Sequence, residues 1–310
     1  MSTATSSQKN QSCMRSFLTK ADGYFQKHQR IPLPRIAHDN LDRLLGLHSF
    51  IDQQETDTDK DDTHHPTANS NKILIIGDVH GCLQELKLLI QKAIHQHNQA
   101  KDFRAIVLVG DLVNKGPQSA EVVKFVRTHR DIFTVRGNHD DRVLAAALGD
   151  EECAQKSKYD WVKTGLSDED VEWMAELPYT ITIPSRLLQQ TQESVHESKQ
   201  DVIVVHAGIL PHVSLEDQTA ITMTTIRNLI SNPDAVDGEE ESIVSIAEAW
   251  KGPELVIFGH DAKRGLQQEE YAIGLDTGCV YGKQLTGIIL PGREIVSVDA
   301  LEEYSPINTE

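Results

Sequence analysis

The stretch Ile76-Gly77-Asp78-Val79-His80-Gly81 begins at the last residue of a short apolar run, residues 72–76. The pattern recurs where Gly110-Asp111 follows the run 103–109 and where Gly137-Asn138-His139-Asp140 follows the run 132–135. Such runs predict buried parallel strands, because both faces of each strand are apolar. Ligands of open α/β sheets gather outside the carboxyl ends of the strands. We therefore expect the polar residues of these three stretches to meet at one sheet edge.

Two apolar runs in the second half of the chain end in the same way. Residues 202–205 lead to His206, and residues 255–258 lead to Gly259-His260. The six candidate metal ligands are then Asp78, His80, Asp111, Asn138, His206 and His260. Oxygen and nitrogen donors without a thiolate suit Mn, Zn, Fe, Co or Mg and argue against Cu(I). Two such ions, bridged by a carboxylate at about 3.5–4 Å, would activate a bridging hydroxide and clamp phosphate oxygens.

The segments between these runs predict an α/β fold. Leucines and isoleucines at helical spacing mark a helix over 83–94, and valines mark another over 122–126. The order strand, helix, strand, helix, strand is a right-handed βαβαβ unit. Further helical segments are expected at 144–148, 159–163, 243–250 and, opened by a Ser167–Asp170 capping box, 171–177. The strand-like runs of the second half of the chain are 180–183, 201–205, 255–258, 272–275, 285–290 and 295–298. Together they suggest two packed sheets with helices outside.

Composition limits the classes of partner. The 310 residues carry a formal net charge of -17, which argues against a general nucleic-acid-binding surface. A local cationic site for a phosphorylated anionic substrate remains compatible with that charge. Four irregularly spaced cysteines indicate no disulfide framework and fit a reducing, cytoplasmic location. No run is long and apolar enough to suggest a membrane span, and the sequence leaves the oligomeric state unknown.

Three regions follow from the local composition. Residues 1–71 are expected to be a flexible N-terminal region with a short helix near Leu41 to Leu47 and an acidic linker. Residues 72–302 should form the catalytic domain, and residues 303–310 a C-terminal tail. The first twenty residues contain Arg15 and no acid, so a mitochondrial targeting segment is the alternative to a flexible tail.

The five blocks in this order resemble the signature of the calcineurin-like metallophosphoesterase superfamily. Within it they are similar to the phosphoprotein phosphatase and ApaH group, and closest to the eukaryotic ApaH-like phosphatases. The resemblance covers about residues 72–300 and implies an αββα sandwich of two mixed β-sheets flanked by helices, with a dinuclear metal site at the strand ends. One such block alone would be weak support, whereas five in order make chance agreement remote.

The resemblance also implies roles for individual residues. Asp78, His80 and His260 would hold the first metal, Asn138 and His206 the second, and Asp111 would bridge them. His139 would protonate the leaving oxygen. Phosphate-binding roles are implied for Asn138 and Arg227, and Lys115 either grips phosphate or lies in solvent. As alternatives outside the site, Cys82 and Cys279 are better explained as small buried residues, and the three tryptophans as core or interface anchors.

The departures from the family pattern bear on the substrate. Ser/Thr phosphatases have Asp-Arg where this chain has Asn114-Lys115, and they end the third block in Glu where it has Asp140. Asn114 can hydrogen-bond His139 but cannot stabilise its cation with charge. These residues favour an ApaH-like hydrolase of phosphoanhydrides, namely dinucleoside polyphosphates, RNA caps or inorganic polyphosphate. A phosphoprotein Ser/Thr phosphatase is the alternative, and a binding module without turnover is a third hypothesis that the complete ligand set makes weak.

Overall fold

The structure is a computed structural model that describes residues 34–45, 71–96, 103–150, 156–189, 200–230 and 242–307. The predicted N-terminal tail, most of the acidic linker and most of the polar loops at 189–200 and 234–241 lie outside these residues. Within the described ranges, no helix is both long and apolar enough to cross a bilayer.

The first sheet contains the predicted βαβαβ unit. Its strands, in order across the sheet, are β13 (Glu294–Asp299), β12 (Gln284–Leu290), β2 (Lys72–Ile76), β3 (Phe103–Leu108) and β4 (Ile132–Thr134). The last three are parallel, while β12 runs antiparallel to both of its neighbours. The parallel strands are joined through α3 (Leu83–Gln96) and α4 (Ser119–Thr128). All three parallel strands therefore point their carboxyl ends to one edge.

The second sheet is also mixed. Its order is β1 (His38–Asn40), β5 (Thr180–Ile183), β6 (Val202–Val205), β9 (Leu255–Phe258), β11 (Ala272–Gly274) and β10 (Gln267–Gln268). The pairs β6–β9 and β9–β11 are parallel, whereas β5–β6 is antiparallel. Strands β6 and β9 therefore deliver the residues that follow them to one edge, as the sequence predicts.

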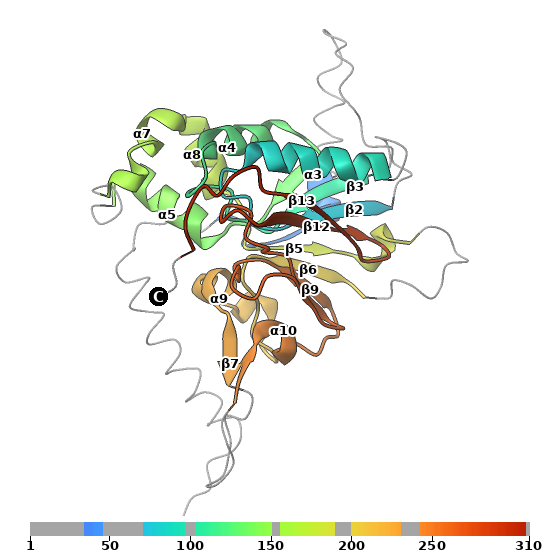
Figure 1. Cartoon of the computed structure of the whole chain (residues 1–310). Coiled ribbons are helices and arrows are strands. Elements are labelled where there is room, and N and C mark those ends of the chain that lie inside the picture. The colour runs from blue at the N-terminus through green and yellow to red at the C-terminus, as the bar shows by residue number, and fades with distance from the viewer. Residues whose placement is uncertain are drawn as a thin grey trace, which may run out of the picture.

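The two sheets pack face to face with helices on both outer sides (Figure 1). On β2, Ile73 and Ile75 lie in the apolar cluster between the sheets, while Leu74 and Ile76 lie in the cluster under the helices. On β6, Val204 faces the sheet interface and Val205 faces the opposite helical layer. Successive side chains of a strand point to opposite faces, so a strand covered on both sides must be apolar throughout. The predicted αββα sandwich is confirmed.

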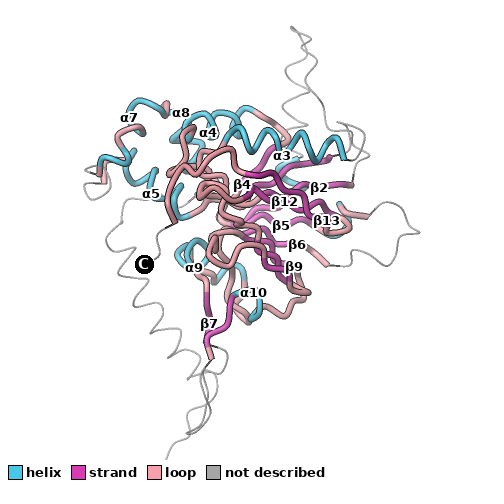
Figure 2. Tube along the Cα trace, in the orientation of Figure 1, coloured by secondary structure: helices cyan, strands magenta, loops and turns pink. Residues whose placement is uncertain are grey.

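The remaining helices complete the outer layers (Figure 2). On the side of the first sheet are α5 (Asn138–Ala147), α7 (Val162–Gly165) and α8 (Asp168–Ala175), together with a 3-10 turn, η1 (Ser157–Tyr159). On the side of the second sheet are α9 (Ala220–Thr225) and α10 (Ile246–Ala249). The capping box predicted for α8 is present: Ser167 Oγ accepts from Asp170 N, and the Asp170 carboxylate accepts from Ser167 N.

The prediction of one helix over 243–250 is wrong in its first three residues. Residues Ile243–Ser245 form β8, which pairs antiparallel with β7 (Asn228–Ile230), and α10 begins only at Ile246. Ser245 explains the change, because its side chain accepts a hydrogen bond from Glu248 N and so caps the helix at that point.

Described structure extends past both limits of the predicted catalytic domain. Upstream, β1 pairs in parallel with β5, and Leu41 is fully buried in the cluster between the sheets. Residues 41–45 are helical, within the range expected for the short N-terminal helix. Downstream, Tyr304 Oη donates to the buried carboxylate of Glu85 on α3 at 2.9 Å. The division into three regions at residues 71 and 302 stays a prediction, but segments on both sides of it are bonded to the sandwich.

Candidate active site

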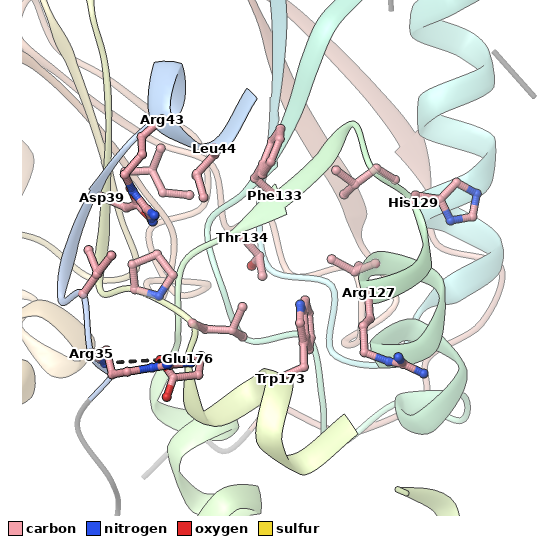
Figure 3. A pocket seen from close by; sticks show the side chains of 16 residues that line it. Arg35, Asp39, Arg43, Leu44, Arg127, His129, Phe133, Thr134, Trp173 and Glu176 are labelled. Carbon is pink, nitrogen blue, oxygen red and sulfur yellow. Dashed lines mark hydrogen bonds and ion pairs between the residues drawn. The ribbon is translucent and has the colours of Figure 1, made fainter. Parts of the chain in front are cut away.

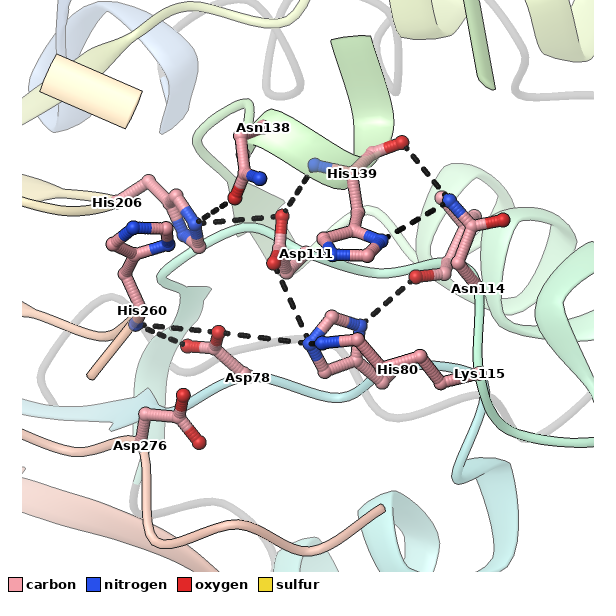
Figure 4. Close-up of polar contacts among 12 residues, drawn as sticks. Asp78, His80, Asp111, Asn114, Lys115, Asn138, His139, His206, His260 and Asp276 are labelled. Atoms are coloured by element: carbon pink, nitrogen blue, oxygen red, sulfur yellow. Dashed lines mark hydrogen bonds and ion pairs between the residues drawn. The ribbon is translucent and has the colours of Figure 1, made fainter. Parts of the chain in front are cut away.

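Five strand ends bring the six predicted ligands to one place (Figure 4). Asp78 and His80 follow β2, Asp111 follows β3, and Asn138 follows β4. From the second sheet, His206 follows β6 and His260 follows β9. The site therefore spans the end of the sandwich, with ligands from both sheets. All six side chains belong to buried residues.

Glycines allow the strand ends to approach one another closely. A Cβ added at Gly259 would collide with the Asp78 carboxylate, and one added at Gly137 would collide with the Asp111 carboxylate and backbone N. A Cβ at Gly116 would meet the carbonyl of His80. The glycines that precede His260 and Asn138 are thus required by contact with the opposite ligand, not only by the turn.

Backbone carbonyls fix the orientation of two imidazoles. His80 Nδ1 lies 3.0 Å from Val113 O, and His206 Nδ1 lies 2.9 Å from Val109 O. A carbonyl only accepts, so each Nδ1 carries the proton and each Nε2 keeps its lone pair. Those Nε2 atoms lie 3.4 Å from the two oxygens of Asp111, His80 from Oδ2 and His206 from Oδ1. His206 Nε2 is also 3.1 Å from Asn138 Oδ1.

Two observations indicate that the six strand-end residues can bind a metal. First, His260 Nε2 is buried and has no hydrogen-bond partner, which is costly unless something not made of protein satisfies it. Second, burial lowers the pKa of His80 to about 4, and it also lowers the pKa of His206 and His260. Each ring is therefore neutral near pH 7, the state in which imidazole binds a metal. Two triplets at this place have their potential ligand atoms within 4.8 Å of one another: His80, Asp111 and His139, and Asp111, His206 and His260.

Asp111 occupies the centre of the cluster. Its Oδ1 accepts from His139 N at 2.8 Å, in addition to facing the two imidazoles. Burial alone would raise the pKa of Asp111, but electrostatic interactions with the side chains of His206, His139, His80 and Lys115 outweigh burial and lower it below its usual value. The central carboxylate is therefore ionised, as a bridging ligand must be.

Asp140 holds the Asp111 loop in place. Its carboxylate is fully buried and accepts from Asp111 N at 2.9 Å, Leu112 N at 3.0 Å and Gly137 N at 2.8 Å. These bonds tie the loop after β3 to the start of α5. The sequence showed Asp140 only as a departure from the phosphatase pattern, and nothing in the local sequence indicates that it supports the central carboxylate.

His139 lies beside the cluster and contacts Asn114, as predicted. Asn114 Nδ2 is 3.3 Å from His139 Nδ1 and 3.3 Å from the His139 carbonyl oxygen. The His139 ring packs edge-on against that of His80, with 4.8 Å between centroids. When the amide donates to Nδ1, the proton of the neutral His139 ring lies on Nε2.

Both of the predicted phosphate-binding cations reach the site. Lys115 Nζ lies 2.9 Å from His80 Nε2, and Arg227 Nη2 donates to His260 O at 3.1 Å. Lys115 is half-buried and Arg227 exposed. Lys115 therefore contacts a predicted ligand, and its role in phosphate binding stays a prediction.

Asp276 also lies at the site, although the sequence pattern assigns it no role. It follows β11, is buried, and hydrogen-bonds Asp78, beside which it appears in Figure 4. Burial raises the pKa of Asp276 to about 6. The signal available in the sequence was its position directly after the apolar strand-like run 272–275, because the other ligands were also identified by their positions after such runs.

A cavity of about 460 Å³ lies elsewhere, between α4, β4, the end of α8 and residues 35–44 (Figure 3). Its three arginines are already paired with acids: Arg35 with Glu176 at 2.9 Å, Arg43 with Asp39 at 2.6 Å, and Arg127 with Asp170 at 2.8 Å. None of the predicted site residues lines it. The cavity is therefore separate from the cluster of strand-end ligands.

Comparison with known proteins agrees with this geometry. The calcineurin-like phosphoesterase family model matches residues 71–269. The asymmetrical bis(5′-nucleosyl)-tetraphosphatase PrpE of Oceanobacillus iheyensis is 28% identical over 245 residues, 75% of this chain and 94% of the relative. A symmetrical bis(5′-nucleosyl)-tetraphosphatase of Methylobacillus flagellatus is 28% identical over 262 residues, 72% of this chain and 93% of the relative.

Among solved structures, one provisionally described as a diadenosine tetraphosphatase is similar with a TM-score of 0.59 and 32% identity, covering 77% of this chain and 97% of the other. The family match spans more than half of the chain and contains the six strand-end ligands, His260 included. This chain belongs to the calcineurin-like phosphoesterase family.

Proposed function

We propose that this protein is a dinuclear-metal hydrolase that cleaves phosphoanhydride bonds of nucleoside polyphosphates. The observation that carries the proposal is the convergence of six buried ligands from two sheets around Asp111, with His260 Nε2 left without a protein partner. The names of the similar tetraphosphatases support the same bond type. Manganese and zinc are the first metals to test, and the cytoplasmic location stays a prediction.

The donor set divides around the central carboxylate. Asp78, His80 and His260 would hold one ion, Asn138 and His206 the other, and Asp111 would bind both. Bound there, the two ions supply charge for phosphate oxygens and a nucleophile at neutral pH. The protein contributes rigid ligands, because the Nδ1 atoms of His80 and His206 are anchored to backbone carbonyls.

In this proposal, His139 donates a proton to the leaving oxygen. Its backbone N is held by Asp111 Oδ1 at 2.8 Å, so the ring stays beside the cluster. Burial lowers the pKa of His139 well below its usual value. Asn114 orients the ring without adding a negative charge. To act as the acid, the ring must first become an imidazolium, which the anionic phosphates of a bound substrate would favour, and its Nε2 proton would then pass to the leaving oxygen and leave a neutral ring. A phosphoanhydride leaves as a stabilised phosphate, which places a smaller demand on the acid than an alkoxide does.

Lys115 and Arg227 supply positive charge to the substrate phosphates. Each lies beside a different part of the ligand set: Arg227 donates to His260 O, and Lys115 Nζ lies 2.9 Å from His80 Nε2, a contact that it would exchange for the phosphates when that nitrogen binds a metal. A chain of phosphates has negative charge on both sides of the bond to be cleaved, so cations on more than one side suit it. Because the chain as a whole has a net charge of -17, the attraction of anionic phosphates is expected only near these two cations.

A parallel assay tests the proposal. Mn-loaded protein is incubated with diadenosine tetraphosphate, capped RNA, long-chain polyphosphate and a phosphopeptide, and the products are separated. Cleavage of one or more anhydrides with the phosphopeptide intact is expected. Cleavage of the phosphopeptide alone would contradict the proposal and establish a protein phosphatase instead. Asp111→Asn protein serves as the control for contaminating hydrolases.

A further inference from the structure

An aromatic residue, Tyr281, lies beside the proposed phosphate-binding lysine and follows β11 in the chain. Lys115 Nζ lies over the Tyr281 ring, 5.1 Å from its centroid, and 2.9 Å from His80 Nε2. These two distances place the ring within about 8 Å of a ligand nitrogen of the site. A nucleoside attached to a phosphate bound there can span that gap.

The ring presents a face toward the site. The Lys115 ammonium lies over this face, 5.1 Å from the ring centroid, so the face is turned to the ligand cluster and becomes available to a base when Lys115 moves onto the bound phosphates. Tyr281 is half-buried and packs against the apolar cluster under α3. A half-buried aromatic ring that turns a face to the phosphate site can serve as a platform on which a base stacks.

The backbone that carries the ring is fixed at several points. Tyr281 N donates to Gly278 O at 3.0 Å, and the carbonyl of the buried Val280 accepts from Tyr304 N and Ser305 N. The same loop begins at Asp276, which hydrogen-bonds the predicted ligand Asp78. The ring is thereby held at a constant offset from the ligand cluster, as a stacking platform requires.

We propose that Tyr281 stacks on the base of the nucleoside next to the bound phosphates, and so selects nucleoside polyphosphates over inorganic polyphosphate. This inference rests on the proposed function, since it assumes that the ligand cluster binds the phosphates. Lys115 connects the two parts: its ammonium reaches the phosphates while its neighbour, the aromatic ring, contacts the base. An inorganic polyphosphate has nothing to place on the ring.

Steady-state kinetics of the full-length, Mn-loaded protein test the inference. Wild type, Tyr281→Leu and Tyr281→Phe are compared on diadenosine tetraphosphate and on inorganic tripolyphosphate, which has no base. We expect Tyr281→Leu to raise KM for diadenosine tetraphosphate roughly 5- to 100-fold, the range for losing one base–aromatic contact. KM for tripolyphosphate should stay unchanged, and Tyr281→Phe, which keeps the ring, should behave like wild type on both.

Binding supplies a second readout. In Mg-loaded wild type, NMR should show contacts between the Tyr281 ring protons and the adenine protons of bound ADP, and these should vanish in Tyr281→Leu. An unchanged KM for diadenosine tetraphosphate in Tyr281→Leu would overturn the inference and leave the proposed function standing. So would an equal loss on both substrates, since the ring would then support the site and not the base. Failure of wild type to cleave either anhydride would instead overturn the proposed function, and the stacking role with it.

Discussion

Three of the six predicted ligands have a left-handed backbone. The φ angles of His80, Asp111 and His260 are 47°, 51° and 67°. A non-glycine residue in this region costs about 1–3 kcal/mol and persists where the surroundings impose it. Here the turn after each strand must send a side chain back over the strand end, and the neighbouring backbone hydrogen bonds hold it there. The strained backbone at these three residues therefore directs their side chains into the ligand cluster.

Replacing Asp111 by Asn should abolish turnover while the fold survives. The amide keeps the shape of the side chain but removes the charge that faces His80 and His206. We expect kcat/KM for diadenosine tetraphosphate to fall at least about 100-fold, with an unchanged far-UV circular dichroism spectrum. Asp299→Asn, at an exposed position of β13, is the matched control. Asp111→Asn protein that kept wild-type turnover would rule out a bridging role.

His139→Ala should impair poor leaving groups most. A general acid raises the rate roughly 100-fold or more when the leaving oxygen is basic, and it raises the rate much less when the leaving oxygen is a stable anion. We therefore expect a larger loss of kcat for an alkyl phosphate than for an aryl phosphate, both measured as probe substrates at saturating metal. Equal losses for the two esters would count against His139 as the proton donor.

At the scale of elements, the position of strands is what the sequence predicts best. The runs at 72–76, 180–183 and 255–258 have the observed bounds of β2, β5 and β9, because strands covered on both faces are apolar throughout. Strands β1, β7, β8 and β10 were not predicted. They have only two or three residues each, several of them polar, and their pairing is decided by tertiary contact.

The candidate site follows the same rule. A polar residue after a buried strand is visible in one sequence, so all six ligands could be named. Asp140 and Asp276 could not be given roles, because their partners, Asp111 N and Asp78, are 29 and 198 residues away and are brought close only by folding. The same holds for the ring of Tyr281 beside Lys115.

The capping box of α8 yields a pH-dependent prediction. Burial raises the pKa of Asp170, but hydrogen bonds from Ser167 and Arg127 outweigh it and leave the pKa below the ordinary 3.8. Since the pKa is lower in the folded state, the ionised carboxylate stabilises the fold above pH 3.8, and this contribution is lost as the pH falls through the folded-state value.

Asp170→Asn should therefore lower the free energy of unfolding by ~1–2 kcal/mol at about pH 7, and by less at about pH 3. Urea unfolding of metal-free protein at both pH values measures the difference without interference from ligand protonation. Asp168→Asn, exposed in the first turn of the same helix, is the control and should change stability little. A loss in Asp170→Asn that did not depend on pH would show that the charge is not responsible.

At the scale of the whole molecule, the sandwich depends on a residue from the region expected to be flexible. Leu41 is 0% exposed and belongs to the cluster between the two sheets. Leu41→Ala should lower the free energy of unfolding by about 2–4 kcal/mol through the cavity it leaves. Leu88→Ala, at an exposed position of α3, should have little effect.

Turnover separates the two possible roles of that N-terminal segment. If it only supports the fold, kcat of Leu41→Ala for diadenosine tetraphosphate should equal that of wild type at a temperature where both are folded. A reduced kcat without loss of stability would mean that the segment acts on the site itself.

The central claim, that the strand-end ligands form a dinuclear site for hydrolysis, is tested most directly by a metal titration. Chelator-treated protein is titrated with Mn²⁺ while bound metal and hydrolysis of diadenosine tetraphosphate are measured on the same samples. We predict that activity reaches its maximum when two ions are bound per chain, and that none appears in their absence. Full activity at one bound ion, or in metal-free protein, would contradict the account.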